Sequence, residues 1–510
     1  MEFNKKTTAM HERRTLFEGT AEQAVDCDIT LPDYFPDVVR VLKCTLTPRL
    51  TVVQGGADRI TADGSGLLRV LYLSEGNTVR CFEQNIPFSK SAETTLPQNA
   101  CVHASASTEY VNCRVVSPRK MDVHGSISVS FKAYCKEPGE IICDCDGAGV
   151  QTRKKKLTVS SLAGCAEKLF TLNETLEIGN AKPSIAQLVR SEATAQLESV
   201  KLVSGKALLK GELTLHTLYI PDGDDSGLQT MEHSMPISQI MEIEGAEEDC
   251  TADVALTVSA LEIAAKTDAS GALRLLDTTV TVCASVELYQ DFDTNVILDA
   301  YSTQYEMQVQ QNPVELRRIC DRFTDTYLCR GTLDLAGSNL AEVADVRCTG
   351  VQYTASTAEN EIRVNGEVAV AVLYRDREGE WGFAQRSFEF SYSRTTANTG
   401  GTLVCTPHIT ATGINFLMNA EDKLDVRVEL DIHALVFTRV TEQIVTDLRL
   451  NEENRKTKKT AALTIYFSQA GESVWDIARR YNTTVEAIMT ENGLEGDVVS
   501  EKCKLLIPRV

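Results

Sequence analysis

The sequence lacks several features that would place it in common classes of protein. No run of apolar residues is long enough to span a bilayer, and the N-terminal stretch has no apolar core of a signal peptide. Basic residues are too few to favour phosphate backbones, because 51 lysines and arginines face 72 aspartates and glutamates, for a formal charge of −21. The sequence therefore predicts a cytoplasmic protein with no membrane span and no nucleic-acid partner.

Motifs of catalysis are also missing. The chain has no glycine loop with a lysine for phosphate, no G-x-S-x-G turn and no H-E-x-x-H helix. With seven histidines, a nucleophile paired to one of them in space stays open, although no pattern marks such a pair. We expect a protein that is not an enzyme, with no catalytic residues, no cofactor and no metal.

Two stretches have some features of metal sites. Cys143 and Cys145 would need two further ligands at suitable spacing, and none lies nearby. Residues 222–227, DGDDSG, begin like a calcium loop, but His233 stands where the bidentate glutamate should be. We interpret the two cysteines as strand or turn residues and the acidic stretch as a hairpin loop.

Cysteine itself is not scarce, but its distribution is that of a reduced protein. The sixteen cysteines are scattered along a long chain without an export signal, so we expect mostly buried thiols. Whether some of them form crosslinks stays open.

The chain contains three copies of one pattern. The strand-like segments GSGLLRVLYL, GELTLHTLYI and GEVAVAVLYR carry Tyr72, Tyr219 and Tyr374, and a second block follows each, ending 62, 70 and 63 residues later. Apolar residues alternate with period two in both blocks, which predicts β-strands. Pro36 and Pro183 suit the first position of a helix, so we expect one short helix per β-rich copy.

Near the C-terminus the period changes. A strand at Ile465, a helix capped by Ser473 and Asp476, a second helix capped by Thr483 and Glu486, and the strand KLLIP predict a compact βααβ unit.

This unit resembles the LysM domain. QAGESVWDIARRYNTTVEAIMTENGL has the glycine turn, the W-x-I-A helix and the asparagine at the end of the second helix, whereas SEKCKLLIP lacks the usual proline-glycine turn. The resemblance implies a shallow groove for N-acetylglucosamine-containing glycans between two loops. The implied groove residues are Ala470, Gly471, Glu472, Ser473, Asn492, Gly493 and Leu494. Four of them, Gly471, Ser473, Asn492 and Gly493, could equally act only as caps and turns.

The three copies resemble the SPOCS domain of spore-forming Firmicutes. The resemblance rests on VVSPRKMDV, FPDVVRVL and the LYL strands, and it weakens in the third copy. Three such domains followed by one LysM domain is the arrangement of SipL-type spore-coat morphogenetic proteins. The expected fold is mainly β, with three tandem SPOCS-like domains, each a sandwich or open barrel with a short helix, and a small C-terminal βααβ LysM domain.

The expected domain boundaries follow from the repeat and from two polar, charged stretches. They are an N-terminal segment 1–24, repeat 1 at 25–146, a linker 147–164, repeat 2 at 165–300, repeat 3 at 310–450, a linker 451–460 and the LysM domain at 461–510.

The resemblance implies a non-enzymatic adaptor in the mother-cell cytoplasm, at the forespore surface and in the spore coat. Its implied partner is the morphogenetic ATPase of the coat's basement layer, bound chiefly through the LysM domain, with other coat proteins as further candidates. Repeated domains without a catalytic site suit a scaffold. The alternative is a peptidoglycan-binding protein of the cell wall or spore cortex, but without an export signal its groove would not meet that glycan.

Overall fold

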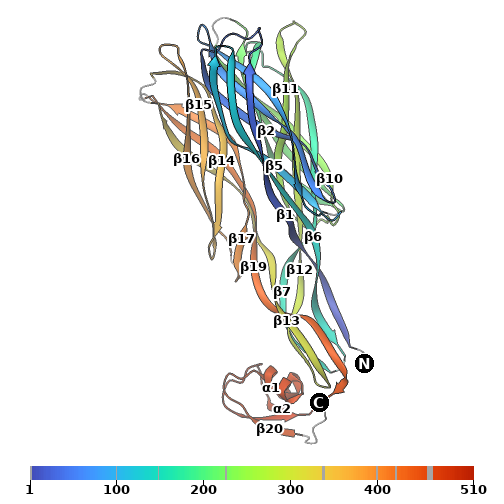
Figure 1. The fold of residues 1–510 in the computed structure, drawn as a ribbon. Coiled ribbons are helices and arrows are strands. Elements are labelled where there is room, and N and C mark those ends of the chain that lie inside the picture. The colour runs from blue at the N-terminus through green and yellow to red at the C-terminus, as the bar shows by residue number, and fades with distance from the viewer. Residues whose placement is uncertain are drawn as a thin grey trace.

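The computed structural model describes residues 3–98, 100–147, 149–223, 227–335, 339–397, 400–419, 422–456 and 463–509. Three β-sandwiches lie together, and their long strands continue into a narrow stalk that ends at a small C-terminal domain (Figure 1). The mainly β fold is confirmed, and within the described ranges the only two helices belong to that C-terminal domain. None of these described helices is long and apolar enough to cross a membrane.

The strands fall into three sets of similar order. Repeat 1 contains β1 (Asn4–Thr30), β2 (Arg40–Gly55), β3 (Arg59–Ser74), β4 (Thr78–Glu93), β5 (Cys101–Ser117) and β6 (Lys120–Asp146). Repeat 2 contains β7 (Val150–Glu177), β8 (Ile185–Val203), β9 (Lys206–Pro221), β10 (Gln229–Glu242), β11 (Thr251–Thr267) and β12 (Leu273–Ser302). Repeat 3 contains β13 (Tyr305–Asp334), β14 (Leu340–Thr357), β15 (Glu361–Asp376), β16 (Trp381–Thr395), β17 (Thr402–Cys405), β18 (His408–Met418) and β19 (Lys423–Arg455).

Each repeat is a pair of antiparallel sheets packed face to face. In repeat 1 the sheet β2-β3-β4 covers β1-β6-β5, and in repeat 2 the sheet β8-β9-β10 covers β7-β12-β11. Repeat 3 follows the same plan, except that β17 and β18 together take the place of one strand beside β19. Val129, Phe131 and Ala133 of β6 are fully buried, so the period of two correctly identified the core face.

The short helices expected at Pro36 and Pro183 are absent, and this prediction is wrong. Both prolines lie in loops that lead into β2 and β8. The buried Tyr72 hydroxyl donates to the Pro36 carbonyl at 3.2 Å, and Tyr219 does the same to Pro183 at 3.0 Å. Each tyrosine belongs to a sheet, so its hydrogen bond to the proline carbonyl fixes the path of the loop. This tertiary contact outweighs the local preference of proline for the start of a helix.

An arginine completes the same loop in the first two repeats. The guanidinium of Arg274 donates to the carbonyls of Lys182, Ile178 and Gly179 at 3.0–3.2 Å. Arg119 binds the corresponding loop of repeat 1 through several carbonyls and Asp37. In repeat 3 the equivalent position before the last strand is Asp422, so this loop lacks the arginine as well as the proline.

The repeats extend further than expected at both ends. Within the expected N-terminal segment 1–24, residues 4–24 are part of repeat 1, because β1 pairs with β6 from Asn4 onward and its Met10 and Val25 are buried. The expected linker 147–164 belongs largely to β7, which pairs with β12 from Val150. A polar, charged sequence is compatible with a strand here because Lys154 and Lys156 form ion pairs with carboxylates of neighbouring strands.

The expected linker 451–460 is also partly strand. Residues 451–455 complete β19, and residues 457–462 lie outside the described part of the chain. The strands on either side of the acidic stretch 222–227, β9 and β10, pair antiparallel, and residues 224–226 lie outside the described part of the chain.

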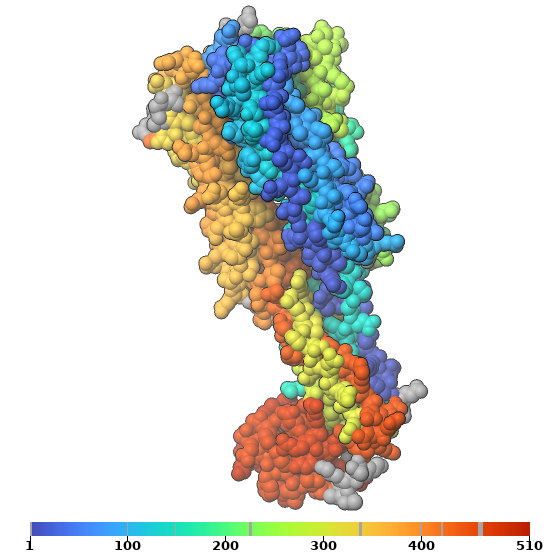
Figure 2. Space-filling model, viewed as in Figure 1, coloured from blue at the N-terminus to red at the C-terminus, as the bar shows by residue number. Residues whose placement is uncertain are grey.

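The stalk has an apolar core to which all three repeats contribute. The long strands β1, β6, β7, β12, β13 and β19 supply this core. Blue, yellow and orange segments, which lie far apart in the sequence, lie together in the narrow stalk (Figure 2). Each strand supplies one buried side chain to the same cluster, namely Met10, Ile141, Val159, Val296, Leu316 and Ile444. A second cluster of six buried residues continues it, drawn from the last strand of each repeat: Ile142, Cys145, Ile297, Ala300, Val445 and Leu448. The repeats therefore form one body.

The sandwiches meet in a ring with approximate threefold order. β4 contacts β8, β10 contacts β14, and β16 contacts β2, so each repeat touches the next and the third returns to the first. Leu73, Leu218 and Leu373 lie in one buried cluster shared by the three repeats. This closed arrangement buries sheet surfaces that isolated domains would expose to solvent.

The loop arginine of repeat 2 provides a test of this account. Arg274→Met should destabilise the protein by about 2 kcal/mol or more, because three carbonyls lose a charged donor. Lys206→Met is the control, since its ion pair with Glu242 is exposed and 3.8 Å long. Urea unfolding followed by circular dichroism measures both, and equal midpoints for the two variants would contradict a structural role for the arginine.

Removing a buried side chain from the stalk should affect the whole molecule. Ile297→Ala should lower the free energy of unfolding by about 2–5 kcal/mol, because Ile297 is fully buried between strands of different repeats. Ile240→Ala, at a position that is 55% exposed, should change stability by only about 0.5 kcal/mol. Thermal unfolding checks this, and a stalk variant as stable as the control would show that the shared core contributes little.

Candidate functional site

The C-terminal domain has the expected βααβ order. It consists of β20 (Leu463–Phe467), α1 (Val474–Tyr481), α2 (Val485–Asn492) and β21 (Lys504–Pro508), and the two strands pair antiparallel. Asn482 and Gly493 end the helices in the left-handed conformation, with φ of 54° and 61°. Asparagine and glycine are the residues that most readily take this conformation, so each helix ends where the sequence offers one of them.

The predicted N-terminal caps are only partly right. Ser473 occupies the N-cap of α1, but its side chain makes no capping hydrogen bond. The N-cap of α2 is Thr484, whose side chain accepts a hydrogen bond from the Ala487 N–H at 3.1 Å. Thr483, the predicted cap, is buried and instead donates to the Pro508 carbonyl at 2.8 Å.

The domain is docked on the end of β12 in repeat 2. Trp475 packs edge-to-face on Tyr301 with ring centroids 4.9 Å apart, and its indole N–H donates to Asp299 at 2.8 Å. Arg479 binds the same carboxylate at 2.7 Å, and the Tyr301 hydroxyl donates to the Thr483 carbonyl at 2.8 Å. Burial, followed by the Asp299 charge, raises the pKa of Tyr301, so the hydroxyl stays a donor.

No local sequence pattern marks this docking surface. The Trp475 ring belongs to the buried core of the C-terminal domain, and the same cluster includes Tyr301 of repeat 2. Asp299 and Tyr301 lie at the end of a long strand with no local pattern to distinguish them. Lys456 adds bonds from its ammonium group to the Ser302 carbonyl and to Asn482.

The first predicted groove loop is closed by backbone pairing. The Gly471 N–H donates to the Val499 carbonyl, and the Val499 N–H donates to the Glu472 carbonyl. The Glu472 carboxylate accepts bonds from the Gln469 N–H and the Tyr466 hydroxyl, which lower its pKa. Ala470 and Gly471 are exposed, and Ser473 forms an isolated bridge with Val498.

The second loop is shaped by Asn492. Its amide donates to the carbonyls of Ile488 and Leu506 and accepts from the Leu506 N–H, all at 2.6–2.8 Å. This side chain therefore joins α2 to β21. Gly493 is exposed at the C-cap, and Leu494 packs partly on the domain core.

A cleft of about 830 Å³ lies between this second loop and β7. Its lining includes Gly493 and Leu494 of the loop and Thr490 of α2, together with Gln151 to Arg153 of β7. None of residues 470–473 lines it. The structure thus places the second loop against the stalk, and the first loop does not share that cleft.

Groups that could hold a metal occur elsewhere. In the described ranges, two sets of three ligand-bearing side chains converge: His103, Glu167 and Cys283, and Asp253, His408 and His433. Cys143 and Cys145 both lie in β6 and belong to neither set. All sixteen cysteines are free thiols in the structure.

Comparison with known families matches parts of this architecture. A family model for the SipL SPOCS domain matches residues 37–116 and 184–266, which span β2–β5 and β8–β11, and a LysM family model matches residues 469–508. No curated protein and no solved structure matches the chain. The chain thus has the SipL-type combination of SPOCS domains and a C-terminal LysM domain.

These domain types limit the range of functions. SPOCS and LysM are binding domains without catalytic activity, and together they indicate a sporulation-related coat protein or a peptidoglycan-binding protein. The LysM domain by itself indicates glycan binding.

The docking contacts can be tested by hydrogen exchange. Asp299→Ala removes the acceptor of both Trp475 and Arg479, so amide exchange in α1 and at the end of β12 should become about tenfold faster or more. Asp293→Ala is the control. Asp293 lies in β12, as Asp299 does, and its ion pair with Lys156 of β7 is exposed. Wild-type exchange rates in Asp299→Ala would show that the domain is held by other contacts.

Proposed function

We propose that this protein is a non-enzymatic spore-coat morphogenetic adaptor. Its LysM domain binds the morphogenetic ATPase of the coat's basement layer, and the repeats offer surfaces to other coat proteins. It acts in the mother-cell cytoplasm at the forespore surface, where it promotes assembly and encasement of the coat. The combination of SPOCS and LysM domains supports a role in sporulation.

The observation that carries the protein-binding role is an apolar stripe on β20. Leu463, Ile465 and Phe467 alternate along this strand and are 44%, 53% and 67% exposed. Three large apolar side chains in one row are costly to leave in water and are typical of a protein interface. The row contains no side-chain hydrogen-bond donor or acceptor with which to orient a sugar.

The position of the domain also favours an adaptor. It lies at the tip of the stalk, away from the three sandwiches (Figure 1). A partner held there leaves the sandwich surfaces accessible, and a chain with several linked binding surfaces gains avidity when they bind together.

Glycan binding is the second candidate, and the cleft beside Gly493 and Leu494 is the feature that favours it. Peptidoglycan of the cell wall or cortex would be the ligand. Two features weigh against this reading, since the Asn492 amide is bonded within the domain and β7 forms the far wall of the cleft. A glycan in this cleft would not contact the predicted groove residues Ala470 to Ser473, because none of them lines it.

Binding assays on the full chain separate these functions. The double variant Ile465→Ser, Phe467→Ser should lose at least tenfold in affinity for the coat ATPase, because burial of two large apolar side chains is removed. Phe416→Ser, at an exposed apolar position of β18, is the matched control and should bind normally. Thr490→Trp fills the cleft and should also leave ATPase binding unchanged.

Sedimentation with purified peptidoglycan is the companion measurement. We expect the wild-type chain to remain in the supernatant. Three results together would contradict the adaptor proposal. The wild-type chain would sediment with peptidoglycan, Thr490→Trp would abolish that sedimentation, and the β20 double variant would bind the ATPase as tightly as the control.

A further inference from the structure

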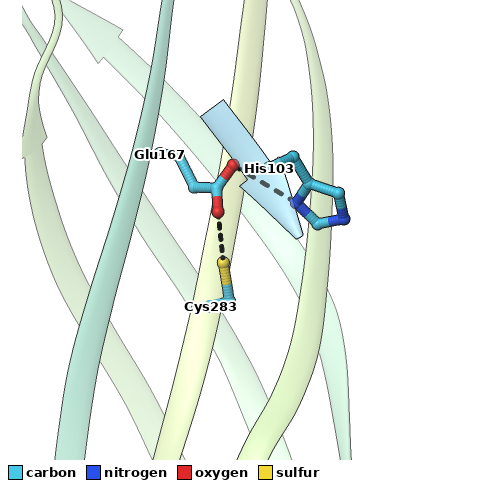
Figure 3. A group of neighbouring side chains, drawn as sticks. All are labelled: His103, Glu167 and Cys283. Carbon is cyan, nitrogen blue, oxygen red and sulfur yellow. Dashed lines mark hydrogen bonds and ion pairs between the residues drawn. The ribbon is translucent and has the colours of Figure 1, made fainter. Parts of the chain in front are cut away.

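Three side chains with metal-binding groups meet between the first two repeats. His103 of β5 belongs to repeat 1, whereas Glu167 of β7 and Cys283 of β12 belong to repeat 2. Figure 3 shows the Glu167 carboxylate between the other two side chains. One carboxylate oxygen lies 3.3 Å from His103 Nδ1 and the other lies 3.2 Å from Cys283 Sγ.

The three groups form a donor set suited to a zinc-like cation. Imidazole nitrogen, carboxylate oxygen and thiolate sulfur are the ligands that Zn²⁺ takes in proteins, at about 2.0–2.3 Å. Tetrahedral ligands at those lengths lie about 3.3–3.6 Å apart, close to the separations seen here. All three donor atoms lie within 4.8 Å of one another, so side-chain rotations of small size would bring them around one ion.

The same trio is poorly arranged for nucleophilic catalysis. Burial, followed by the charge of Glu167, raises the pKa of the Cys283 thiol, which disfavours the thiolate. A catalytic cysteine needs a basic or positively charged neighbour instead. A divalent cation would reverse this effect, because it stabilises both the thiolate and the carboxylate.

The second cluster, between repeats 2 and 3, has a less suitable geometry. The His408 and His433 rings are stacked, 4.8 Å apart and 16° from parallel. Ring nitrogens bind metals in the plane of the ring, and two stacked planes do not converge on one ion. Burial, followed by His408, lowers the pKa of His433 to about 4, as expected for a neutral, packed ring. This cluster serves as an internal comparison.

We propose that His103, Glu167 and Cys283 bind one divalent cation of the zinc class, which joins repeat 1 to repeat 2. On binding, the cation displaces the thiol proton of Cys283 to solvent, and His103 binds through a deprotonated Nδ1 with its remaining ring proton on Nε2. The doubly charged ion is balanced by the thiolate and the carboxylate. A fourth ligand position stays open to water, because the protein supplies three donors. The site is structural, since it links strands of two sandwiches.

Metal analysis of the intact chain tests the proposal. The full-length protein, stripped with a chelator, is mixed with ZnCl₂, desalted and analysed by atomic emission. We expect about one Zn²⁺ per chain and an unfolding temperature several degrees above that of the stripped protein. Cobalt added in place of zinc should give the near-ultraviolet absorption of a thiolate-to-cobalt charge transfer.

Matched variants assign the site. Cys283→Ser, Glu167→Gln and His103→Gln should each lower the affinity for Zn²⁺ at least tenfold and remove the thermal shift. Cys329→Ser changes another buried strand cysteine, and His408→Gln changes the second cluster, so both should retain the ion.

The outcomes are distinguishable even if a variant fails to fold. Absence of bound zinc in the wild-type chain, or cobalt binding without the thiolate absorption, overturns the proposal. So does zinc binding that persists in Cys283→Ser and is lost in His408→Gln, which would place the ion in the second cluster.

Discussion

The long pairing of the first and last strands of each repeat determines the shape of this molecule. β1 pairs with β6, β7 with β12 and β13 with β19 along nearly their whole lengths, so the chain enters and leaves every repeat at the same end. Three two-stranded ribbons therefore emerge side by side from the sandwiches. A two-stranded ribbon has too little core to be stable alone, and these three bury their apolar faces against one another in the stalk.

The three repeats are similar but not interchangeable, because equivalent positions at the junction between the sandwiches carry different charges. Lys43, Arg190 and Asp345 occupy equivalent positions, opposite Leu71, Leu218 and Leu373 on the neighbouring strand. Three identical charges at such a junction would repel, whereas Arg190 and Asp345 form an ion pair at 3.0 Å with both side chains largely buried. Divergence among the copies thus fits each repeat to its neighbours.

The stalk presents the C-terminal domain in a defined orientation. Tyr301 and Asp299 of repeat 2 hold Trp475, so the face of the domain that meets the stalk is set by a repeat rather than by a free linker. The apolar stripe of β20 remains exposed, which agrees with a partner that binds the tip. The proposed cation site of His103, Glu167 and Cys283 lies between the sandwiches of repeats 1 and 2. A cation bound there would join the two sandwiches from which the stalk emerges.

The sequence by itself determined the features that depend on local periodicity. Alternation identified the buried faces of β3, β6 and β19, and asparagine and glycine mark the C-terminal ends of the two helices, because these signals come from neighbouring positions in the chain. Only the tertiary structure decided what depends on distant partners. Pro36 stands in a loop because Tyr72 binds its carbonyl, and β1 became a strand because it pairs with β6, from Asn4 with Asp146 to Thr30 with Lys120. His103, Glu167 and Cys283 are separated by 64 and 116 residues and meet because strands of two repeats lie side by side. Pairing register and packing between repeats bring such residues together, and no local pattern contains that information.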